Sequence, residues 1–415
     1  MRNVATLMTG TGLAQLIPIL ASPLLTRLYG PESFGTLAVF LGCMTVVVVF
    51  ISGRYELAIV VPQKMRDAAS LFVLAAAIAI FIALIMLISI LMYFIFLNES
   101  LFQLDNSFKL VILLVPISAL MVAVNQCAYY WCNRYKDYRS IALNKITHSI
   151  VIVGVQVGFG IYVESGLGLI VGYLSGQLVS MIILVAIIWN SHSNEFRQVR
   201  FIDITRVARR YIDFPKFLIF SHSISKIAAQ APAISFNGLF GAAPAGYYML
   251  AQRAVGSPMT ILSSAIGDIF RQQASSEYSK VGSCEGVFTK AFLRLVLLSI
   301  LPFSVLYLFA PDIFEIVFGK EWREVGGYIR VLAPMYMIRF VVSPLSSMFM
   351  IAEAQKIDVV FTSCLLIFVI LSIATGFYEG NIILSLSAYS VSYSFFYLAS
   401  GYYSYKLALG KNHGT

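Results

Sequence analysis

Residues 24–35 read LLTRLYGPESFG, and this short polar segment joins two long apolar stretches at residues 4–25 and 34–52. Each stretch is about as long as the roughly 20 residues that an α-helix needs to cross a bilayer. The first stretch is too long for the apolar part of a typical signal peptide, and Arg27 follows it without a small-residue cleavage site. The pattern therefore predicts a hairpin of two membrane-spanning helices at the start of the chain.

A second segment of the same design lies at residues 239–246, which read LFGAAPAG. In both segments a leucine, an aromatic residue and a glycine are followed five residues later by another glycine. The spans that lead into the two segments are predicted to cross the membrane in the same direction. We therefore expect two similar halves related by an axis along the membrane normal, which is a recurrent plan among transporters.

Composition also indicates a membrane protein. The chain of 415 residues is 59% hydrophobic and only 12% charged, with a mean hydropathy of +0.83, whereas ordinary soluble domains carry roughly 25% charged residues. The five cysteines are scattered without a CxxC pair, so neither a metal site nor a disulfide framework is indicated, and no cofactor is expected. The net charge of +9 could suggest nucleic-acid binding, but the positions of the basic residues matter more than their sum. No nucleic-acid partner is expected.

Apolar segments recur along the whole chain, and helices are expected in them because every backbone N–H and C=O group must be satisfied inside lipid. We predict an all-α integral membrane protein with about twelve transmembrane helices in two six-helix bundles. The predicted spans cover residues 4–26, 34–53, 71–96, 109–132, 144–163, 166–189, 213–236, 245–269, 287–310, 328–350, 357–378 and 382–404.

Basic residues orient these spans. Most of the 29 Lys and Arg residues fall in loops on one side of the predicted membrane, and only four fall in loops on the other. Because cytoplasmic loops carry the excess of Lys and Arg, both termini are predicted to be cytoplasmic. The expected organisation is an N-terminal bundle over 1–190, a basic cytoplasmic linker over 191–212, a C-terminal bundle over 213–404 and a cytoplasmic tail over 405–415.

Three cations lie at membrane depth within the predicted spans, namely Lys226, Arg253 and Arg339. A charge that faces lipid at this depth costs at least about 2.5–3.5 kcal/mol, so such residues usually face a cavity or a partner. The sequence places no carboxylate at a comparable depth, which favours a wet, positive cavity. One cation 4 Å from an anion gains about 4 kcal/mol at an effective dielectric of about 20. The three side chains therefore suit a phosphate or diphosphate group; the alternative is that they bond to helix-end carbonyls or snorkel.

Arg27 and Arg54 flank the second span at its opposite ends. They either contact a substrate or anchor the topology, and Glu56 is near enough in sequence to form an ion pair with Arg54. A set of carboxamides in the spans either lines a path for sugars or, for most members, forms hydrogen bonds between helices. The set consists of Asn125, Gln126, Asn144, Gln156, Gln177, Gln230 and Gln252.

Three passages carry a resemblance to a known family: residues 25–35 together with 53–59, residues 246–253 followed by Pro258, and residues 318–322 leading into the span with Arg339. On these passages the chain resembles the O-antigen and polysaccharide flippases of the Wzx type. These belong to the multidrug/oligosaccharidyl-lipid/polysaccharide (MOP) exporter superfamily. The resemblance implies a MATE-like pair of six-helix bundles around a central cavity.

The same resemblance implies a function. It implies translocation of an undecaprenyl-diphosphate-linked oligosaccharide, an O-antigen or related surface polysaccharide unit, from the cytoplasmic to the periplasmic leaflet of the bacterial inner membrane. Arg253, Lys226 and Arg339 are then expected to bind the diphosphate, and Arg27 and Arg54 to guide or gate access. The expected partners are this lipid-linked oligosaccharide, the bilayer and the polysaccharide polymerase complex. Relatives that flip the peptidoglycan precursor have two further C-terminal spans, so that substrate is set aside.

Two rival functions are considered. A cation-coupled multidrug exporter of the same superfamily needs an acidic residue inside a bundle, and residues 4–25 contain none. An integral glycosyltransferase or polymerase needs a sizeable outer loop with catalytic groups, whereas the longest outer loop, residues 311–327, is short. The loops contain no Walker A, HExxH, GxSxG or DxD sequence, so the chain is not expected to be an enzyme and no catalytic residue is assigned.

Overall fold

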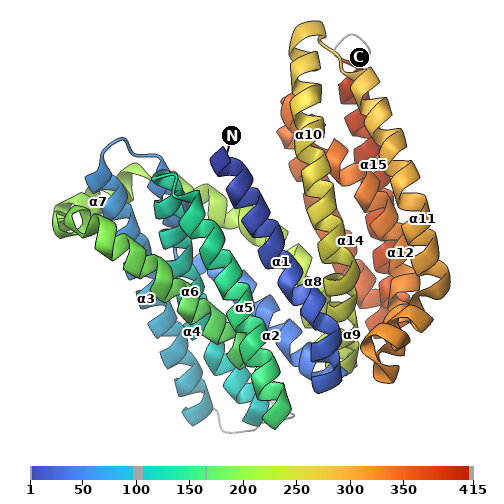
Figure 1. The fold of residues 1–415 in the computed structure, drawn as a ribbon, viewed down its shortest axis with the longest axis horizontal. Coiled ribbons are helices and arrows are strands. Elements are labelled where there is room, and N and C mark those ends of the chain that lie inside the picture. The colour runs from blue at the N-terminus through green and yellow to red at the C-terminus, as the bar shows by residue number, and fades with distance from the viewer. Residues whose placement is uncertain (1, 97–105, 164–165, 411–415) are drawn as a thin grey trace. The chain divides into compact units, whose positions relative to one another are not determined.

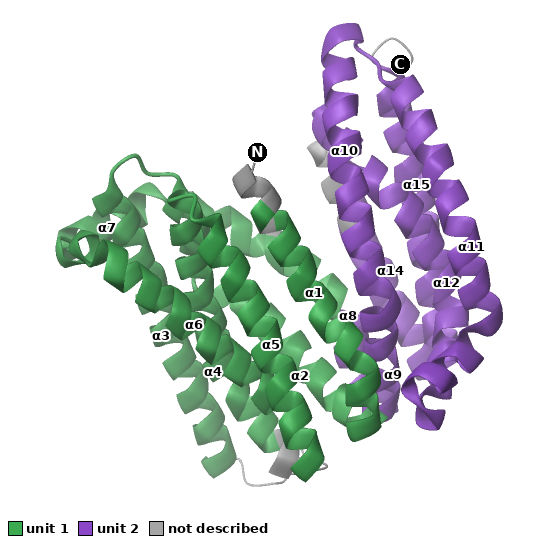
Figure 2. Cartoon of the chain, in the orientation of Figure 1, with its two compact units in different colours: residues 1–230 green, residues 231–415 purple. Residues whose placement is uncertain are grey.

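The computed structural model describes residues 2–96, 106–163 and 166–410, and every regular element within these ranges is helical (Figure 1). The chain divides into two compact units, residues 1–230 and 231–415, which Figure 2 shows in green and purple. The division falls inside helix α8 (Ile219–Phe240). The prediction of an all-α protein is therefore confirmed.

The N-terminal unit contains six long helices and a short helix after them. They run in chain order as α1 (Arg2–Leu28), α2 (Pro31–Ile51), the 3₁₀ turn η1 (Tyr55–Val60), α3 (Met65–Phe96), α4 (Asn106–Arg134), α5 (Tyr138–Tyr162), α6 (Leu167–Arg197), α7 (Phe201–Arg210) and the π turn η2 (Phe214–Leu218), which leads into α8. Its largest fully buried side chain is Trp131 of α4, which packs edge-on against Phe72 of α3 and, tilted, against Phe196 of α6.

The C-terminal unit has its own set of helices. It contains α9 (Ala242–Ala251), the π turn η3 (Gln252–Gly256), α10 (Ser257–Val281), α11 (Glu285–Phe318), the 3₁₀ turn η4 (Lys320–Trp322), α12 (Arg323–Leu345), α13 (Met348–Ile351), α14 (Gln355–Tyr378) and α15 (Ile382–Leu409). The segment from α9 to α10 is one continuous helical run that changes its hydrogen-bonding pattern at η3.

Four helix pairings recur in both units. In the N-terminal unit α3 packs on α4, α2 and α6 pack on α4, and α5 packs on α6. In the C-terminal unit α11 packs on α12, α10 and α15 pack on α12, and α14 packs on α15. Chain order relates the helices of these four pairings, so the halves expected from the repeated turn share this part of their arrangement. They differ at their first helices, because α1 packs extensively on α5, whereas the described residues show no comparable pairing of α8 with α14.

Nine of the described helical segments are long and apolar enough to cross a membrane. The remaining predicted spans correspond to α8, the α9–α10 run and α14, which contains a shorter apolar segment, Ser363–Tyr378. Two of these less apolar spans carry Lys226 and Arg253, two of the three deep cations that the sequence singles out.

The two repeated turns differ in their backbone. In the first, Gly30 is extended, and Pro31 opens α2 at a position where its missing N–H costs nothing. In the second, Gly241 has φ +98°, a conformation that side chains with a Cβ rarely adopt. The first turn is held on α5 because the buried Tyr29 hydroxyl donates to the Gln156 carbonyl oxygen at 2.7 Å.

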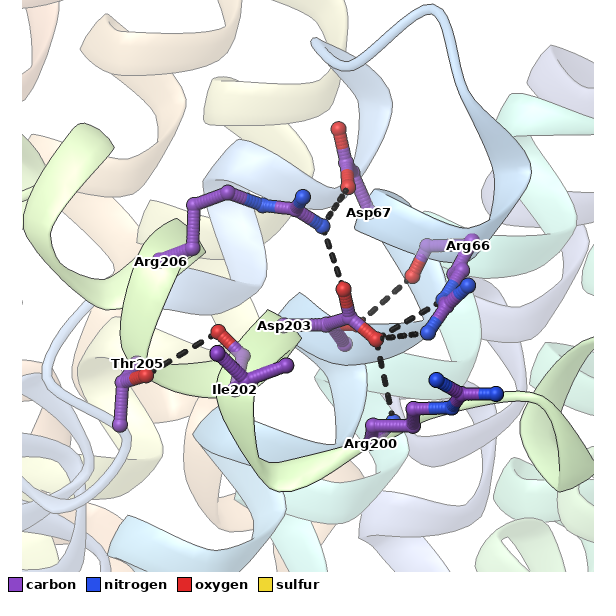
Figure 3. A network of polar contacts seen from close by, with 8 residues as sticks. Arg66, Asp67, Arg200, Ile202, Asp203, Thr205 and Arg206 are labelled. Atoms are coloured by element: carbon purple, nitrogen blue, oxygen red, sulfur yellow. Dashed lines mark hydrogen bonds and ion pairs between the residues drawn. The ribbon is translucent and has the colours of Figure 1, made fainter.

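Residues 191–212, expected to form a linker, are largely helical. Helix α6 continues through a kink at His192 to Arg197, and α7 then lies against α3. Figure 3 shows how ionic contacts fix α7: the Asp203 carboxylate accepts hydrogen bonds from the Arg66 guanidinium, and Arg206 contacts Asp203 at 2.5 Å and Asp67 at 3.2 Å. Burial raises the pKa of Asp203, but hydrogen bonds from the Arg66 side chain and the Arg200 backbone, with nearby positive charge, lower it overall.

Candidate functional site

Arg253 lies on a local change of helix type. The turn Gln252–Gly256 is π-helical, and π turns inside longer helices frequently occur at functional sites. The Ser257 hydroxyl donates to the Gln252 carbonyl oxygen at 3.2 Å, which supports the widened turn. The Arg253 side chain is half-buried and takes part in an interaction within the chain. The helix thus presents an arginine where its backbone departs from regular α geometry.

Arg339 of α12 is the centre of a cluster of aromatic hydroxyls in the C-terminal unit. It is half-buried and lies within electrostatic range of tyrosines from three helices, α9, α12 and α15. These tyrosines are Tyr248, Tyr336, Tyr389, Tyr393 and Tyr397. We call this group the tyrosine cluster.

Hydrogen bonds connect the tyrosine cluster to the turn that carries Arg253. The Gln252 Nε2 group donates to the Tyr248 hydroxyl at 2.8 Å, and the Tyr248 hydroxyl donates to the Tyr389 hydroxyl at 3.4 Å. The rings of Tyr389 and Tyr393 lie 4.6 Å apart between centroids. Tyr336 is fully buried, and its hydroxyl has no hydrogen-bond partner among the described residues. The cluster therefore retains hydrogen-bonding capacity.

The charge of Arg339 lacks a carboxylate partner in the part of the chain that the structure describes, where the ion pairs involve other residues. Tyrosine hydroxyls offer acceptor oxygens but no formal negative charge. A cation withdrawn from water with only neutral neighbours favours an anion that brings its own charge. Guanidinium groups suit phosphate because their planar fork can form two parallel hydrogen bonds.

In the N-terminal unit, unlike Arg339, Arg54 has a carboxylate partner. Arg54 is 8% exposed, Glu56 is fully buried, and the Arg54 Nη1 atom lies 3.3 Å from the Glu56 Oε1 atom. The ion pair expected from the sequence is therefore present. Arg54 also has a left-handed backbone, with φ of 60°. Its charge is compensated locally, which makes it less suited to a free anion than Arg339.

Lys226 and Arg54 both act electrostatically on His222 in the N-terminal unit. His222, one turn before Lys226 on α8, lies within electrostatic range of Lys226, Arg54 and Glu56. Lys226 is exposed and belongs to none of the ion pairs of the described residues. Arg27 is also exposed and lies at the end of α1, beside the first turn.

The structure adds Lys145 and His148 to the carboxamides that the sequence singles out. Lys145 lies in α5, half-buried, and donates to the Thr11 hydroxyl at 3.1 Å. One turn along α5, His148 borders a cavity among α4, α5 and α6 that Lys145 also lines. The spacing of Asn144, Lys145 and His148 on one helical face was the signal that could have revealed it. Among the described residues, no group of three or more His, Cys, Asp or Glu side chains could hold a metal ion.

Most of the chain matches a family of known proteins. Residues 24–326 match the family described as polysaccharide biosynthesis protein. No curated protein matches the chain by sequence.

Solved structures are similar in fold at low sequence identity. The lipid II flippase MurJ in an inward closed conformation matches with a TM-score of 0.70 and 11% identity, over 97% of this chain and 89% of that one. An inward-facing multidrug resistance MATE transporter of the MOP superfamily gives 0.66 and 12%, over 96% and 93%. A MOP transporter from Pyrococcus furiosus, described as having a binding pocket of reverse polarity, gives 0.59 and 13%, over 96% and 93%. The MATE-like membrane fold expected from the sequence is thus confirmed.

Proposed function

Because the chain belongs to the polysaccharide biosynthesis protein family, we propose that it moves a lipid-linked oligosaccharide diphosphate across the bacterial inner membrane. The proposed substrate is an undecaprenyl-diphosphate-linked unit of O-antigen or a related surface polysaccharide. It would pass from the cytoplasmic to the periplasmic leaflet, with both chain termini in the cytoplasm. The MOP transporter fold supports a transport role rather than catalysis.

The observation that carries this proposal is the tyrosine cluster around Arg339. The head group of the substrate is an anion that lipid rejects, and Arg339 has no carboxylate partner in the described part of the chain. A diphosphate would supply the missing negative charge, and the tyrosine hydroxyls would donate to its remaining oxygens. We assign Arg253 and Lys226 to the same head group, and Arg27 and Arg54 to access.

The proposed mechanism is alternating access. Four helix pairings recur in the two units, and many secondary transporters built from such repeats work by alternating access. The cationic side chains would lower the barrier for the diphosphate, while the isoprenoid tail stays in lipid. Release into the opposite leaflet requires that the binding be reversible.

The proposal is tested in a bacterial strain that lacks its own polysaccharide flippase. The wild-type chain should restore surface polysaccharide, and Arg253→Ala should abolish this while the protein stays in the membrane. Arg271→Ala is the matched control, because Arg271 lies in α10 as an exposed arginine paired with Asp268. If the wild type restores nothing, or if Arg253→Ala exports normally, the proposed function fails. Single-unit polysaccharide at the surface, without long chains, would instead indicate a polymerase.

Cation-coupled multidrug export is a second candidate, because of one residue. Glu56 is fully buried, and its Oε2 atom has no hydrogen-bond partner among the described residues. Such a carboxylate is what coupling to a cation requires, although Arg54 already compensates its charge. Expression in a strain without multidrug pumps separates the candidates: protection from cationic drugs that is lost in Glu56→Gln would favour this function.

A further inference from the structure

A cavity lies among α4, α5 and α6 of the N-terminal unit. Its volume is about 300 Å³, and polar side chains of all three helices face it. This volume is at the lower end of the roughly 300–1,000 Å³ of small-molecule sites. The lining side chains on which the argument rests are Asn125, Gln126, Asn144, Lys145, His148 and Gln177.

The amide groups of this cavity have unpaired acceptors. The Asn144 side chain is 5% exposed, and its Nδ2 group donates to the Ser180 hydroxyl at 2.7 Å. Its Oδ1 atom has no hydrogen-bond partner among the described residues, and the same holds for the Gln126 Oε1 atom. A buried acceptor without a partner is costly, so something in the cavity is expected to donate to it.

The donors beside these acceptors are only partly used. The Lys145 ammonium donates to the Thr11 hydroxyl and lies 5.3 Å from the centroid of the Tyr129 ring, which leaves N–H bonds that can point elsewhere. The buried Nε2 atom of His148 also lacks a partner in the described part of the chain. The residues that line the cavity therefore carry both unpaired acceptors and partly used donors.

This combination selects among ligands. No carboxylate lines the cavity and Lys145 is close, so a metal cation is disfavoured. An anion would meet Lys145 but also the two unpaired amide oxygens, which repel it. A hydroxyl group donates to an amide oxygen and accepts from an ammonium at once. A small ring that carries several hydroxyls therefore matches the amide oxygens and the Lys145 ammonium together.

We propose that this cavity binds a sugar ring. The inference rests on the proposed function only for the source of the sugar, which is either the saccharide of the lipid-linked substrate or a free sugar. The chemistry is the same for both sources. The competing occupant is water, of which about ten molecules would fill the volume at roughly 30 Å³ each.

The first test measures binding of methyl α-D-glucopyranoside and N-acetylglucosamine to the purified full-length protein in detergent, by saturation-transfer NMR. The wild type should show saturable binding of at least one of them. Gln126→Met removes an unpaired acceptor at similar volume and should weaken binding roughly threefold to tenfold, as expected for one hydrogen bond. Gln63→Met, the same change at an exposed position, should bind as the wild type does.

The outcomes that overturn the proposal are a wild type without saturable binding of either sugar, and equal binding by Gln126→Met and Gln63→Met. Thermal unfolding without sugar checks that the variants are folded. If Gln126→Met unfolds early, His148→Leu provides the same comparison from α5.

The polysaccharide assay then identifies the source. Reduced export by Gln126→Met together with weaker sugar binding assigns the cavity to the substrate saccharide, whereas normal export with weaker binding assigns it to a free sugar. Both results support the cavity as a sugar site. If the wild type binds sugar but never restores polysaccharide, the proposed function fails and the sugar site stands.

Discussion

Arg54 and Arg339 are arginines at membrane depth or its edge, and the two units surround them differently. Arg54 sits beside the fully buried Glu56, which supplies the opposite charge at 3.3 Å. Arg339 sits among neutral tyrosines and pairs with no carboxylate in the described part of the chain. Charge compensation, rather than depth or residue type, therefore separates an arginine that stabilises its unit from one that is available to a ligand.

The largest expected effect is on export by Arg339→Ala. Loss of a charge-assisted contact to the diphosphate removes roughly 1.5–3 kcal/mol of binding, which corresponds to about a tenfold to hundredfold loss. The measurement is the rate of surface polysaccharide appearance, normalised to the amount of protein in the membrane.

Arg330→Ala is the control for this prediction. Arg330 lies in the same helix but is exposed, and its guanidinium donates to the Leu308 carbonyl oxygen at 2.7 Å. Equal export by the two variants would remove the distinction between Arg339 and other arginines of α12. An Arg339→Lys variant with intermediate export would show that charge contributes apart from the planar fork.

The second effect concerns stability and should appear at Glu56. Glu56→Ala leaves the Arg54 charge buried without its partner, and breaking a buried ion pair costs roughly 3–5 kcal/mol. The midpoint of thermal unfolding in detergent should fall strongly. The double variant Arg54→Met with Glu56→Leu should recover much of the loss, because it removes both charges. If Glu56→Ala were as stable as the wild type, the ion pair would contribute nothing to stability. The contrast between Arg54 and Arg339 would then not rest on charge compensation.

Much of this arrangement could be predicted from the sequence. Uninterrupted apolar stretches define the helices because lipid leaves the backbone few alternatives, and the repeated turn indicated the two halves. The ion pair of Arg54 and Glu56 was also accessible, because its partners are two residues apart in sequence. These predictions depend on local spacing or on composition.

The features that the sequence did not predict depend on tertiary structure. The π turn at Arg253 changes only the hydrogen-bonding register of one helical turn, which apolar periodicity does not report. Helix α7 lies in a polar segment whose ionic contacts to α3 come from residues far away in sequence. The tyrosines of α15 lie far from Arg339 in sequence, and only the fold brings them near it.

A third effect tests compensation outside the membrane, at α7. The pKa of Asp203 is lowered in the folded state, so its contribution to stability is present above the pKa of the unfolded chain, about 3.9 for an aspartate. The contribution disappears as the pH falls through the lower folded pKa. Wild-type protein should therefore lose stability relative to Asp203→Asn on acidification below about pH 4.

The control for Asp203 is Asp268→Asn. Asp268 contacts Arg271 at 2.6 Å, but both side chains are about half exposed, and exposed pairs contribute little. Its unfolding midpoint should follow the wild type at every pH. If Asp203→Asn also follows the wild type through the acid range, the contacts in Figure 3 do not hold α7 energetically.

The smallest effect is expected inside the tyrosine cluster itself. Tyr248→Phe keeps the ring but removes the hydroxyl that accepts from Gln252 at 2.8 Å and donates weakly to Tyr389 at 3.4 Å. Stability should fall by about 0.5–1.5 kcal/mol, the usual net contribution of one hydrogen bond. Export should fall by less than in Arg339→Ala, because the cation remains. Tyr307→Phe, an exposed tyrosine of α11, is the matched change. If Tyr248→Phe abolished export as completely as Arg339→Ala, the hydroxyls rather than the uncompensated charge would hold the ligand.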